Sequence, residues 1–575
     1  MSDARPPESD EPSEDDMYTR PLGAGIDFAD LNSRLAPLYF GVSGVLATAL
    51  LAAVFLFYAS LPLNHTDVWV HLKYGQRIVE TRQLPDTEPF SPFTDKETNL
   101  VNAQWLSQVL YAAAFRAGEA LHGGPADAKW LGGAELLRAL HAVAVTAFLG
   151  LIGLAVRRAS GFPGLAVVAM ALLAVAMLPV GTHRPQTFGL VGYAAVLALV
   201  SPPVPSRRVA WLTPLVMALW ANLHGSFVIG FILLGIVLVG RGIDAARAAG
   251  WSVSAVRTDV GVRRILIGTA LSLAAVLVNP YGPKLVMAVL TFGSNPNLKT
   301  LMEWTPLRPF EPSLGTIVFW ALLVGNLVVF GVGFRSLSAV RVLVVMAFAA
   351  AVLLQQRMIV WWIPVGVWAF VSQLGAILRT RGVVLPGVVP NLKLTILSLL
   401  LAVPILLLSP LFQWLQRGGA TDPKKVVHPG TPNELVAVLR NPAVDPGERM
   451  RPLAAFLRER YAGQPVGPVF GAEGVGEFLL WADVPGCPPL FFTHAHLFSP
   501  EHWQASQTVL NGESGWREIL DRAGVNLVAV EPDIRGRLAG LIARDPDWQV
   551  VLNEAGGAGR DVRGRLFVAV RKQPK

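Results

Sequence analysis

Residues 38–61 read LYFGVSGVLATALLAAVFLFYASL, a stretch without a single charged side chain. About 20 such residues are enough for a helix to cross the hydrocarbon core of a bilayer. Directly afterwards, residues 63–75 read LNHTDVWVHLKYG, where an acid, two histidines and a lysine appear together. The two stretches together predict a membrane helix that is followed directly by polar residues at the membrane surface.

Ten further apolar stretches follow the first one along the chain. They cover residues 133–156, 162–181, 186–200, 209–222, 226–239, 265–278, 314–333, 342–354, 359–378 and 394–415. Hydrophobic residues make up 53% of the chain and charged residues 15%, whereas a typical soluble domain is about 25% charged. We therefore predict a mainly α-helical, polytopic membrane bundle of about 11 transmembrane helices. An ordinary soluble enzyme, a disordered chain and a fibrous repeat are excluded.

The basic residues between these stretches indicate the orientation of the bundle. If the N-terminus is cytoplasmic, about thirteen arginines fall in cytoplasmic gaps and about five basic residues in outer gaps, as the positive-inside rule expects. The net charge of +8 reflects these arginines, so nucleic acid is not an expected partner. We expect a multi-pass membrane protein, anchored by an uncleaved first span, with an extracytoplasmic C-terminal domain; the resemblance described below implies the bacterial cytoplasmic (inner) membrane.

Three regions lie outside the predicted spans. Residues 1–35 are acidic and rich in proline and serine, which predicts a disordered cytoplasmic tail. Within the bundle region 36–417, residues 62–132 form a long first outer loop. Its two amphipathic segments, 67–81 and 102–121, predict helices lying in the membrane interface with their apolar faces toward the lipid.

Residues 418–575 predict a small soluble α/β domain, because strand-like and helix-like segments alternate there. The expected strands cover 465–472, 525–531, 548–554 and 564–572. The expected helices cover 435–440, 450–462, 515–524 and 535–545. Cys487 is the only cysteine, which excludes an intramolecular disulfide and a cysteine-based zinc cluster.

Acids and histidines gather in the predicted outer loops, whereas the cytoplasmic gaps carry mostly arginines. A transporter would place such groups near the membrane midplane. We therefore predict a site at the outer surface. Asp67 and His71 are four residues apart, so they share one helix face. Asp67 is the candidate general base toward an acceptor hydroxyl; the alternative is an acid that only complements the helix N-terminus.

The other candidates each carry an open alternative. Glu88 is a second catalytic acid or an exposed loop carboxylate. Arg184 and Arg357 are candidates to bind a lipid phosphate. The alternative for Arg184 is a contact with lipid headgroups, and the alternative for Arg357 is a topological anchor. Asn222 and His224 face a cavity where the helix breaks. The predicted substrate-binding residues are therefore His71, Arg184, Asn222, His224 and Arg357.

Metal binding is weakly indicated. Asp67, His71 and His65 offer a carboxylate and two imidazoles, but so close in sequence they are a poor metal signature. We therefore predict no metal ligands and leave the cofactor undetermined. Three histidines of the C-terminal domain, His494, His496 and His502, are interpreted as ordinary surface or core residues.

The stretches DVWVHLKYGQRIVETRQLPDTEPFSPF (67–93) and NAQWLSQVL (102–110), with RPQTF, LWANLHGSF and VNPYG further on, resemble a bacterial group of multi-pass proteins. This group looks like the C-type (GT-C) glycosyltransferase superfamily, and the resemblance covers most of residues 60–575. In that superfamily the first outer loop supplies a catalytic acid, which by match is Asp67. Two positions depart from the family pattern: Glu88 replaces an aspartate, and Gln104 replaces a glutamate.

The resemblance implies a membrane glycosyltransferase, a hexosyl or pentosyl transferase of the cell envelope. It would move a sugar from a polyprenyl-phosphate donor to a glycan, lipid or protein acceptor at the outer face of the membrane. Membrane lipid is the remaining expected partner. Two other functions stay open: a non-catalytic binder of lipid-linked glycans in envelope assembly, and a transporter or flippase.

Overall fold

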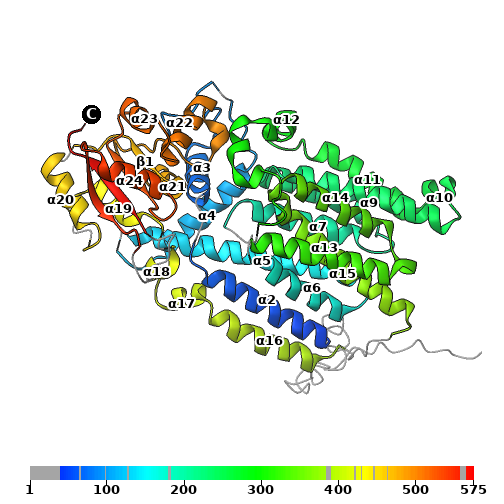
Figure 1. Cartoon of the computed structure of the whole chain (residues 1–575). Coiled ribbons are helices and arrows are strands. Elements are labelled where there is room, and N and C mark those ends of the chain that lie inside the picture. Colours follow the sequence, from blue (N-terminus) through cyan, green and yellow to red (C-terminus); the bar gives the residue numbers. More distant parts are fainter. Residues whose placement is uncertain are drawn as a thin grey trace, which may run out of the picture.

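The computed structural model of the chain contains a helical bundle with an α/β domain at one end (Figure 1). It describes residues 39–63, 67–97, 99–125, 128–178, 183–311, 313–383, 390–419, 423–428, 430–443, 447–462, 464–556 and 565–574. The predicted disordered tail lies outside these residues. The end of the bundle farthest from the α/β domain carries the short helix α10 (Val253–Thr258).

Each predicted span coincides with an apolar helix. The bundle consists of α2 (Val42–Ser60), α5 (Lys129–Ser160), α6 (Pro163–Ala176), α7 (Gln186–Val200), α8 (Val209–Leu223), α9 (Phe227–Ala248), α11 (Val260–Ala275), α13 (Leu314–Val332), α14 (Ala339–Leu354), α15 (Ile359–Thr380), α16 (Leu392–Leu407) and α17 (Pro410–Gln416). Within the described residues, five helices are long and apolar enough to cross a membrane, or six if the bent pair α16 and α17 counts as one span. Helix length therefore supports a membrane-embedded protein but does not by itself establish eleven crossings.

The last predicted span is not continuous. The structure ends α16 at Leu407 and begins α17 at Pro410, with a bend of 66° between them. Proline lacks a backbone N–H, so Pro410 cannot donate a hydrogen bond to the preceding turn, and a helix is commonly kinked or ended at such a position. Ser409 instead starts a new helix, since its hydroxyl accepts the backbone N–H of Phe412. The expected span over 394–415 thus consists of two helical segments.

Short elements also occur along the described chain: the first six connect bundle helices, and the last belongs to the α/β domain. They are α12 (Pro283–Thr291) and the 3₁₀ turns η4 (Phe292–Ser294), η5 (Pro296–Thr300), η6 (Met302–Trp304), η7 (Phe334–Ser336), η8 (Gln356–Met358) and η9 (Ala495–Leu497). The turns η5 and η6 lie between the bundle and the domain, because Asn297 donates its side-chain amide to the carbonyls of Ala495 and Phe498 over 2.8 and 2.9 Å.

The C-terminal domain is built on a four-stranded sheet, and the four predicted strands are confirmed. They are β1 (Val469–Gly471), β2 (Leu527–Val530), β3 (Trp548–Asn553) and β4 (Phe567–Arg571). The strand order is β1-β2-β4-β3, with β1 and β2 parallel and the other two pairs antiparallel. All four strands contribute buried apolar side chains, so both faces of the sheet are covered by helices.

Seven helices of this domain are described. They are α18 (Pro423–Val426), α19 (Asn433–Arg440), α20 (Arg451–Arg460), α21 (Glu473–Ala482), α22 (Pro500–Leu510), α23 (Trp516–Arg522) and α24 (Gly536–Arg544). The four predicted helices correspond to α19, α20, α23 and α24. The sequence did not predict the other three, α18, α21 and α22.

The first outer loop forms the two expected helices, α3 (Asp67–Thr81) and α4 (Trp105–Leu121). However, α3 does not present its apolar face to lipid. Its Trp69 ring lies 4.8 Å from the ring of Phe478 and 4.7 Å from that of Trp481, both on α21. The predicted interfacial position of α3 is corrected accordingly: the α/β domain covers that face, and α3 lies between the domain and the bundle (Figure 1).

A close backbone approach holds α3 against α4. A Cβ atom at Gly75 would lie 1.9 Å from the backbone oxygen of Gln108, so only glycine allows this spacing. Four residues earlier on α3, the buried ring of His71 then lies within hydrogen-bonding distance of the Gln108 side chain. The position of α3, and of Asp67 at its first turn, therefore depends on this contact.

Replacing Gly75 with alanine tests this dependence. The added methyl group meets backbone, which cannot move aside, so Gly75→Ala should lower the free energy of unfolding by about 1–3 kcal/mol. Thermal denaturation of the purified protein in detergent would measure the change. In the matched control Gly540→Ala, the new Cβ has no heavy atom within 4 Å, and the melting temperature should stay the same or rise. Equal melting temperatures for both variants would contradict the prediction.

Candidate functional site

The centre of the candidate site is an ion pair between Asp67 and Arg184. Asp67 is the first residue of α3, where an acid complements the positive end of the helix. Its Oδ2 lies 3.1 Å from Nε of Arg184, which directly precedes the first turn of α7. Both side chains keep some exposure, 20% and 26%. The fold thus brings together two predicted residues from distant parts of the chain.

A second acid extends this pair into a row of alternating charges. Glu303 on η6 lies 3.4 Å from Arg184 Nη1 through Oε2 and 3.6 Å from Arg357 Nη1 through Oε1. The guanidinium of Arg357 also lies over the Trp304 ring at 4.4 Å, a cation–π geometry. We call Asp67, Arg184, Glu303 and Arg357 the charge row. Its formal charges cancel, and Glu303 was not among the predicted site residues.

His224 lies near the two arginines of this row. Its Nδ1 accepts the backbone N–H of Ser226 over 3.1 Å and lies 2.7 Å from the Ser226 hydroxyl. Burial, followed by the positive charges of Arg357 and Arg184, lowers the pKa of His224 to about 3. The imidazole is therefore neutral at physiological pH, so it can offer an N–H group but no positive charge.

The α/β domain contributes a buried acid and a histidine beside α3. The ring of His494 lies 5.0 Å from that of His71, and its Nδ1 lies 3.6 Å from Oε1 of Glu477. Glu477 is fully buried, and its carboxylate accepts the backbone N–H and the hydroxyl of Thr493. His494, interpreted from the sequence as an ordinary histidine, thus lies at the interface between the domain and the candidate site.

The protonation of these groups is coupled. Burial raises the pKa of Glu477 to about 7. Burial would lower the pKa of His494, but the hydrogen bond and negative charge of Glu477 outweigh this and raise it. Burial and then the neighbouring His494 lower the pKa of His71 well below its usual value. Around neutral pH, protons are therefore held on the Glu477–His494 pair rather than on His71.

His71 is oriented by a chain of amide groups. Asn102 donates its amide N–H to Oε1 of Gln108 over 2.6 Å, and the Gln108 amide lies 3.2 Å from Nδ1 of His71. With Nδ1 accepting, the ring proton of neutral His71 sits on Nε2. These buried hydrogen bonds link α3 to α4 one turn after Asp67.

Two predicted site residues make other contacts. Glu88 accepts the backbone N–H groups of Phe90 and Ser91, both over 2.8 Å, and the hydroxyl of Thr94 over 2.9 Å. It also lies 3.4 Å from Lys96. These donors all come from its own loop, so Glu88 organises the segment between α3 and α4.

Asn222 joins helices instead of facing the charge row. Its Oδ1 accepts the indole N–H of Trp105 over 3.0 Å, and its amide donates to the carbonyls of Ala218 and Val278, each over 2.8 Å. The side chain therefore ties α4 and α8 to the end of α11. Two further histidines of the domain pack against aromatic rings, His496 on Phe292 and His502 on Phe498.

The metal alternative involves His65, which lies outside the described residues. Among the residues that are described, no group of three histidine, cysteine or acidic side chains is arranged to hold a metal ion.

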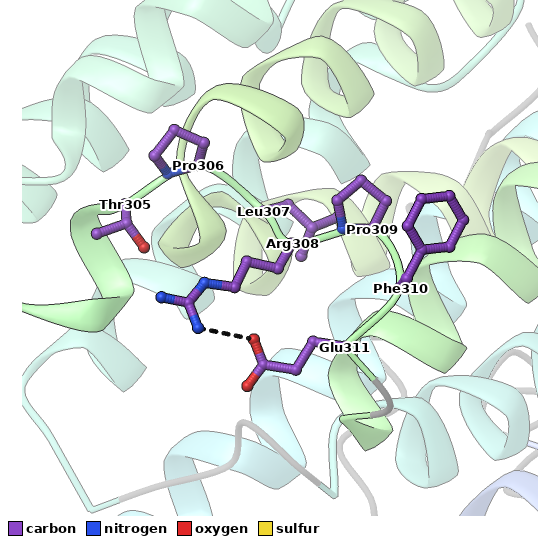
Figure 2. Close-up of a pocket in the computed structure, with 7 residues that line it drawn as sticks. All are labelled: Thr305, Pro306, Leu307, Arg308, Pro309, Phe310 and Glu311. Atoms are coloured by element: carbon purple, nitrogen blue, oxygen red, sulfur yellow. Dashed lines mark ion pairs between the residues drawn. The ribbon is translucent and has the colours of Figure 1, made fainter.

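A shallow surface hollow borders the charge row on the Glu303 side. Figure 2 shows its lining, residues 305–311, with Arg308 turned toward Glu311 at 3.6 Å. The Thr305 carbonyl accepts the backbone N–H of Gln356 over 3.0 Å, which ties this loop to the turn that carries Arg357. A separate, small cavity on the bundle side of Arg184 is lined by Tyr58, His141 and Thr187 among others.

Comparisons with known proteins give distant structural likenesses. No family model matches the chain, and no curated protein does. A crystal structure of the Archaeoglobus fulgidus oligosaccharyltransferase in the apo form aligns with a TM-score of 0.49 and 12% identity, covering 87% of this chain and 70% of that one. The crystal structure of ArnT from Cupriavidus metallidurans bound to undecaprenyl phosphate aligns with a TM-score of 0.42 and 14% identity, covering 91% and 97%. At this distance, residue roles do not transfer.

The raised pKa of Glu477 predicts a loss of stability with rising pH. The carboxyl ionises near 4.5 in the unfolded chain and near 7 in the folded one. The folded protein therefore binds more protons between these values, and its free energy of unfolding falls as the pH rises through them. The raised pKa of His494 adds a loss of the same sign above its usual value of 6.5.

Glu477→Gln should therefore remove this contribution, so that between about pH 4.5 and 7 the melting temperature of the variant falls less, or rises more, with pH than that of the wild type. Thermal denaturation in detergent measures this slope. The exposed carboxylate of Glu513 in the same domain provides the control, and Glu513→Gln should keep the wild-type slope. An unchanged slope in Glu477→Gln would contradict the assignment.

Proposed function

We propose that this protein is a membrane glycosyltransferase that moves a sugar from a polyprenyl-phosphate donor to an acceptor hydroxyl. The observation that carries the proposal is the 3.1 Å contact between Asp67 and Arg184 within the charge row. A candidate base and phosphate-binding groups thereby stand side by side, partly exposed, where the bundle meets the α/β domain. The motif resemblance of the first outer loop supports the same assignment.

The arginines provide the phosphate site. Guanidinium groups bind phosphate oxygens through paired, charge-assisted hydrogen bonds. Arg184 and Arg357 share the single carboxylate of Glu303 at 3.4 and 3.6 Å, distances longer than an optimal charged hydrogen bond. A donor phosphate would replace Glu303 between them and draw Arg184 away from Asp67. The neutral His224 would add an N–H donor without adding charge.

The reaction then proceeds as a single displacement. The acceptor oxygen bonds to the anomeric carbon as the bond from that carbon to the phosphate oxygen breaks. Asp67 takes the hydroxyl proton, and the phosphate leaves with the bonding electrons, which the arginines stabilise. The sugar passes through an oxocarbenium-like state. Because one base and one displacement suffice, the anomeric configuration is inverted.

The α/β domain would complete the acceptor side of the site. It covers α3 through Trp69 and places His494 beside His71. We assign Glu477 and His494 a positioning role, since they act on Asp67 through His71 and α3. The Glu88 carboxylate accepts hydrogen bonds from its own loop. We therefore expect the replacement of the family's aspartate by glutamate at this position to affect the loop geometry rather than proton transfer.

The arginine bias between the spans supports an orientation with the N-terminus in the cytoplasm and the charge row at the outer face of the inner membrane. The packing of α3 against α21 requires Asp67 and the α/β domain to lie on the same side, as this orientation needs.

The assignment of Asp67 is tested by isosteric substitution. Asp67→Asn keeps the shape of the side chain but removes the base, and we expect transfer from a labelled polyprenyl-phosphate sugar to fall by about 10²–10⁴-fold. The control is Asp95→Asn, another acid of the same outer loop, which should retain activity. Equal activity of the two variants would refute the role of Asp67. Donor-dependent thermal stabilisation without turnover in the unaltered protein would instead indicate a glycan-binding protein.

The role of Arg357 is tested through donor affinity. Losing one charge-assisted hydrogen bond costs about 1.5–3 kcal/mol, so Arg357→Gln should raise KM for the donor by about 10–150-fold with a smaller effect on kcat. Arg308 is a matched control, since it lies on the neighbouring loop but pairs with Glu311 (Figure 2). Arg308→Gln should keep the wild-type KM. A similar KM increase in both variants would indicate a general effect of surface charge.

A further inference from the structure

A second polar cavity lies at the opposite end of the bundle from the charge row. It has a volume of about 400 Å³ and lies among the last turns of α5, α7, α9 and α15 and the first turns of α11 and α14. Helix α9 connects the two regions: it begins after His224 and ends beside the cavity, and its 22 residues span about 33 Å at 1.5 Å per residue. The cavity is therefore separate from the proposed active site.

Three arginines line this cavity, and its two acids are already engaged. Asp259 lies 3.2 Å from Arg241 and also accepts the backbone N–H of Val262. Asp244 accepts the hydroxyl of Ser338 over 2.5 Å and the backbone N–H of Ala339 over 2.8 Å. Neither carboxylate has the other two cavity arginines, Arg341 and Arg379, as an ion-pair partner.

Arg341 and Arg379 have only neutral acceptors within the described part of the chain. Arg341 donates to the side-chain oxygen of Gln373, and Arg379 donates to the carbonyl of Ser160. Neither lies within 4 Å of a described carboxylate. The guanidinium groups of Arg341 and Arg379 therefore face the cavity without a carboxylate in direct contact, and Asp244 acts on Arg341 only from beyond 4 Å. An anion placed between the two arginines would supply that contact.

An unpartnered buried donor adds an independent observation. Trp368 lines the cavity and is only 4% exposed, yet its indole N–H has no acceptor among the described residues. Leaving such a donor unsatisfied costs about 1–3 kcal/mol. Arginines at a membrane surface are commonly explained by contact with headgroups, but that explanation does not account for a buried indole N–H in the same wall.

We propose that this cavity binds a phosphate group, held by Arg341 and Arg379 and accepting the indole N–H of Trp368. Guanidinium pairs suit phosphate oxygens, and Val200, Val237 and Val340 supply an apolar wall beside them. The phosphate belongs to either an anionic lipid headgroup or a small soluble phosphate. In the orientation proposed above, the cavity faces the cytoplasm. The inference is independent of the glycosyltransferase proposal.

Binding is tested on the full chain in detergent, by native mass spectrometry and thermal stabilisation. The probes are dioleoylphosphatidylglycerol, inorganic phosphate, and dioleoylglycerol as the lipid without phosphate. We expect one of the phosphate probes to bind and dioleoylglycerol not to bind. Binding of phosphatidylglycerol alone identifies a lipid headgroup, whereas stabilisation by inorganic phosphate identifies a soluble source.

Two variants separate this site from general charge attraction. Trp368→Phe keeps the ring and removes the N–H, and Arg341→Gln removes one guanidinium; each should weaken binding of the active probe by about tenfold. Arg263→Gln is the matched control, since it removes an exposed arginine at the same end of the bundle that does not line the cavity. Affinity unchanged in Trp368→Phe, or lowered equally in Arg341→Gln and Arg263→Gln, would overturn the proposal, as would binding of neither phosphate probe. Trp368→Phe also keeps the test valid if Arg341→Gln does not fold.

Discussion

The burial of α3 between α4 and the α/β domain is the interaction on which the rest of the arrangement depends. Gly75 allows the backbones of α3 and α4 to touch, and Trp69 fills the aromatic contact with α21. Packing on both sides leaves the helix little freedom to pivot. Because Asp67 is the first residue of α3, this packing determines where its carboxylate stands relative to Arg184. An α3 lying free in the membrane interface would give Asp67 no fixed partner.

The two ends of the bundle differ in how arginines and carboxylates are paired, and this difference affects how each end could bind an anion. In the charge row, two acids alternate with two arginines, so an incoming anion must exchange with a carboxylate. Under the proposed function, such an exchange would release Asp67 only when a phosphate is present, which would link base activation to donor binding. In the distal cavity, arginines exceed the available carboxylates, so an anion can be added without displacing one. The first arrangement suits turnover, and the second suits stable occupancy.

Much of the candidate site could be predicted because polar residues at the ends of apolar runs are rare and costly. Asp67, Arg184 and Arg357 were identified in this way, and they meet in the structure. Glu303 was not singled out, since its partner Arg184 is 119 positions away and no local pattern links them. Glu477 interrupts an apolar run of the sequence, and its pairing with His494 became visible only in the structure. For Glu88 the sequence left two roles open, and its hydrogen-bond donors within its own loop became visible only in the structure.

The sequence by itself determined the long apolar helices, the four strands of the C-terminal domain and the concentration of acids and histidines at one end. These features depend on local composition and periodicity. Only the tertiary structure decided what covers the apolar face of α3, where the last span bends, and which side chains pair with Asp67. Periodicity shows that a helix face avoids water, but lipid and protein both satisfy that requirement. Choosing between them requires the shape of α21, which lies about 400 residues further along the chain.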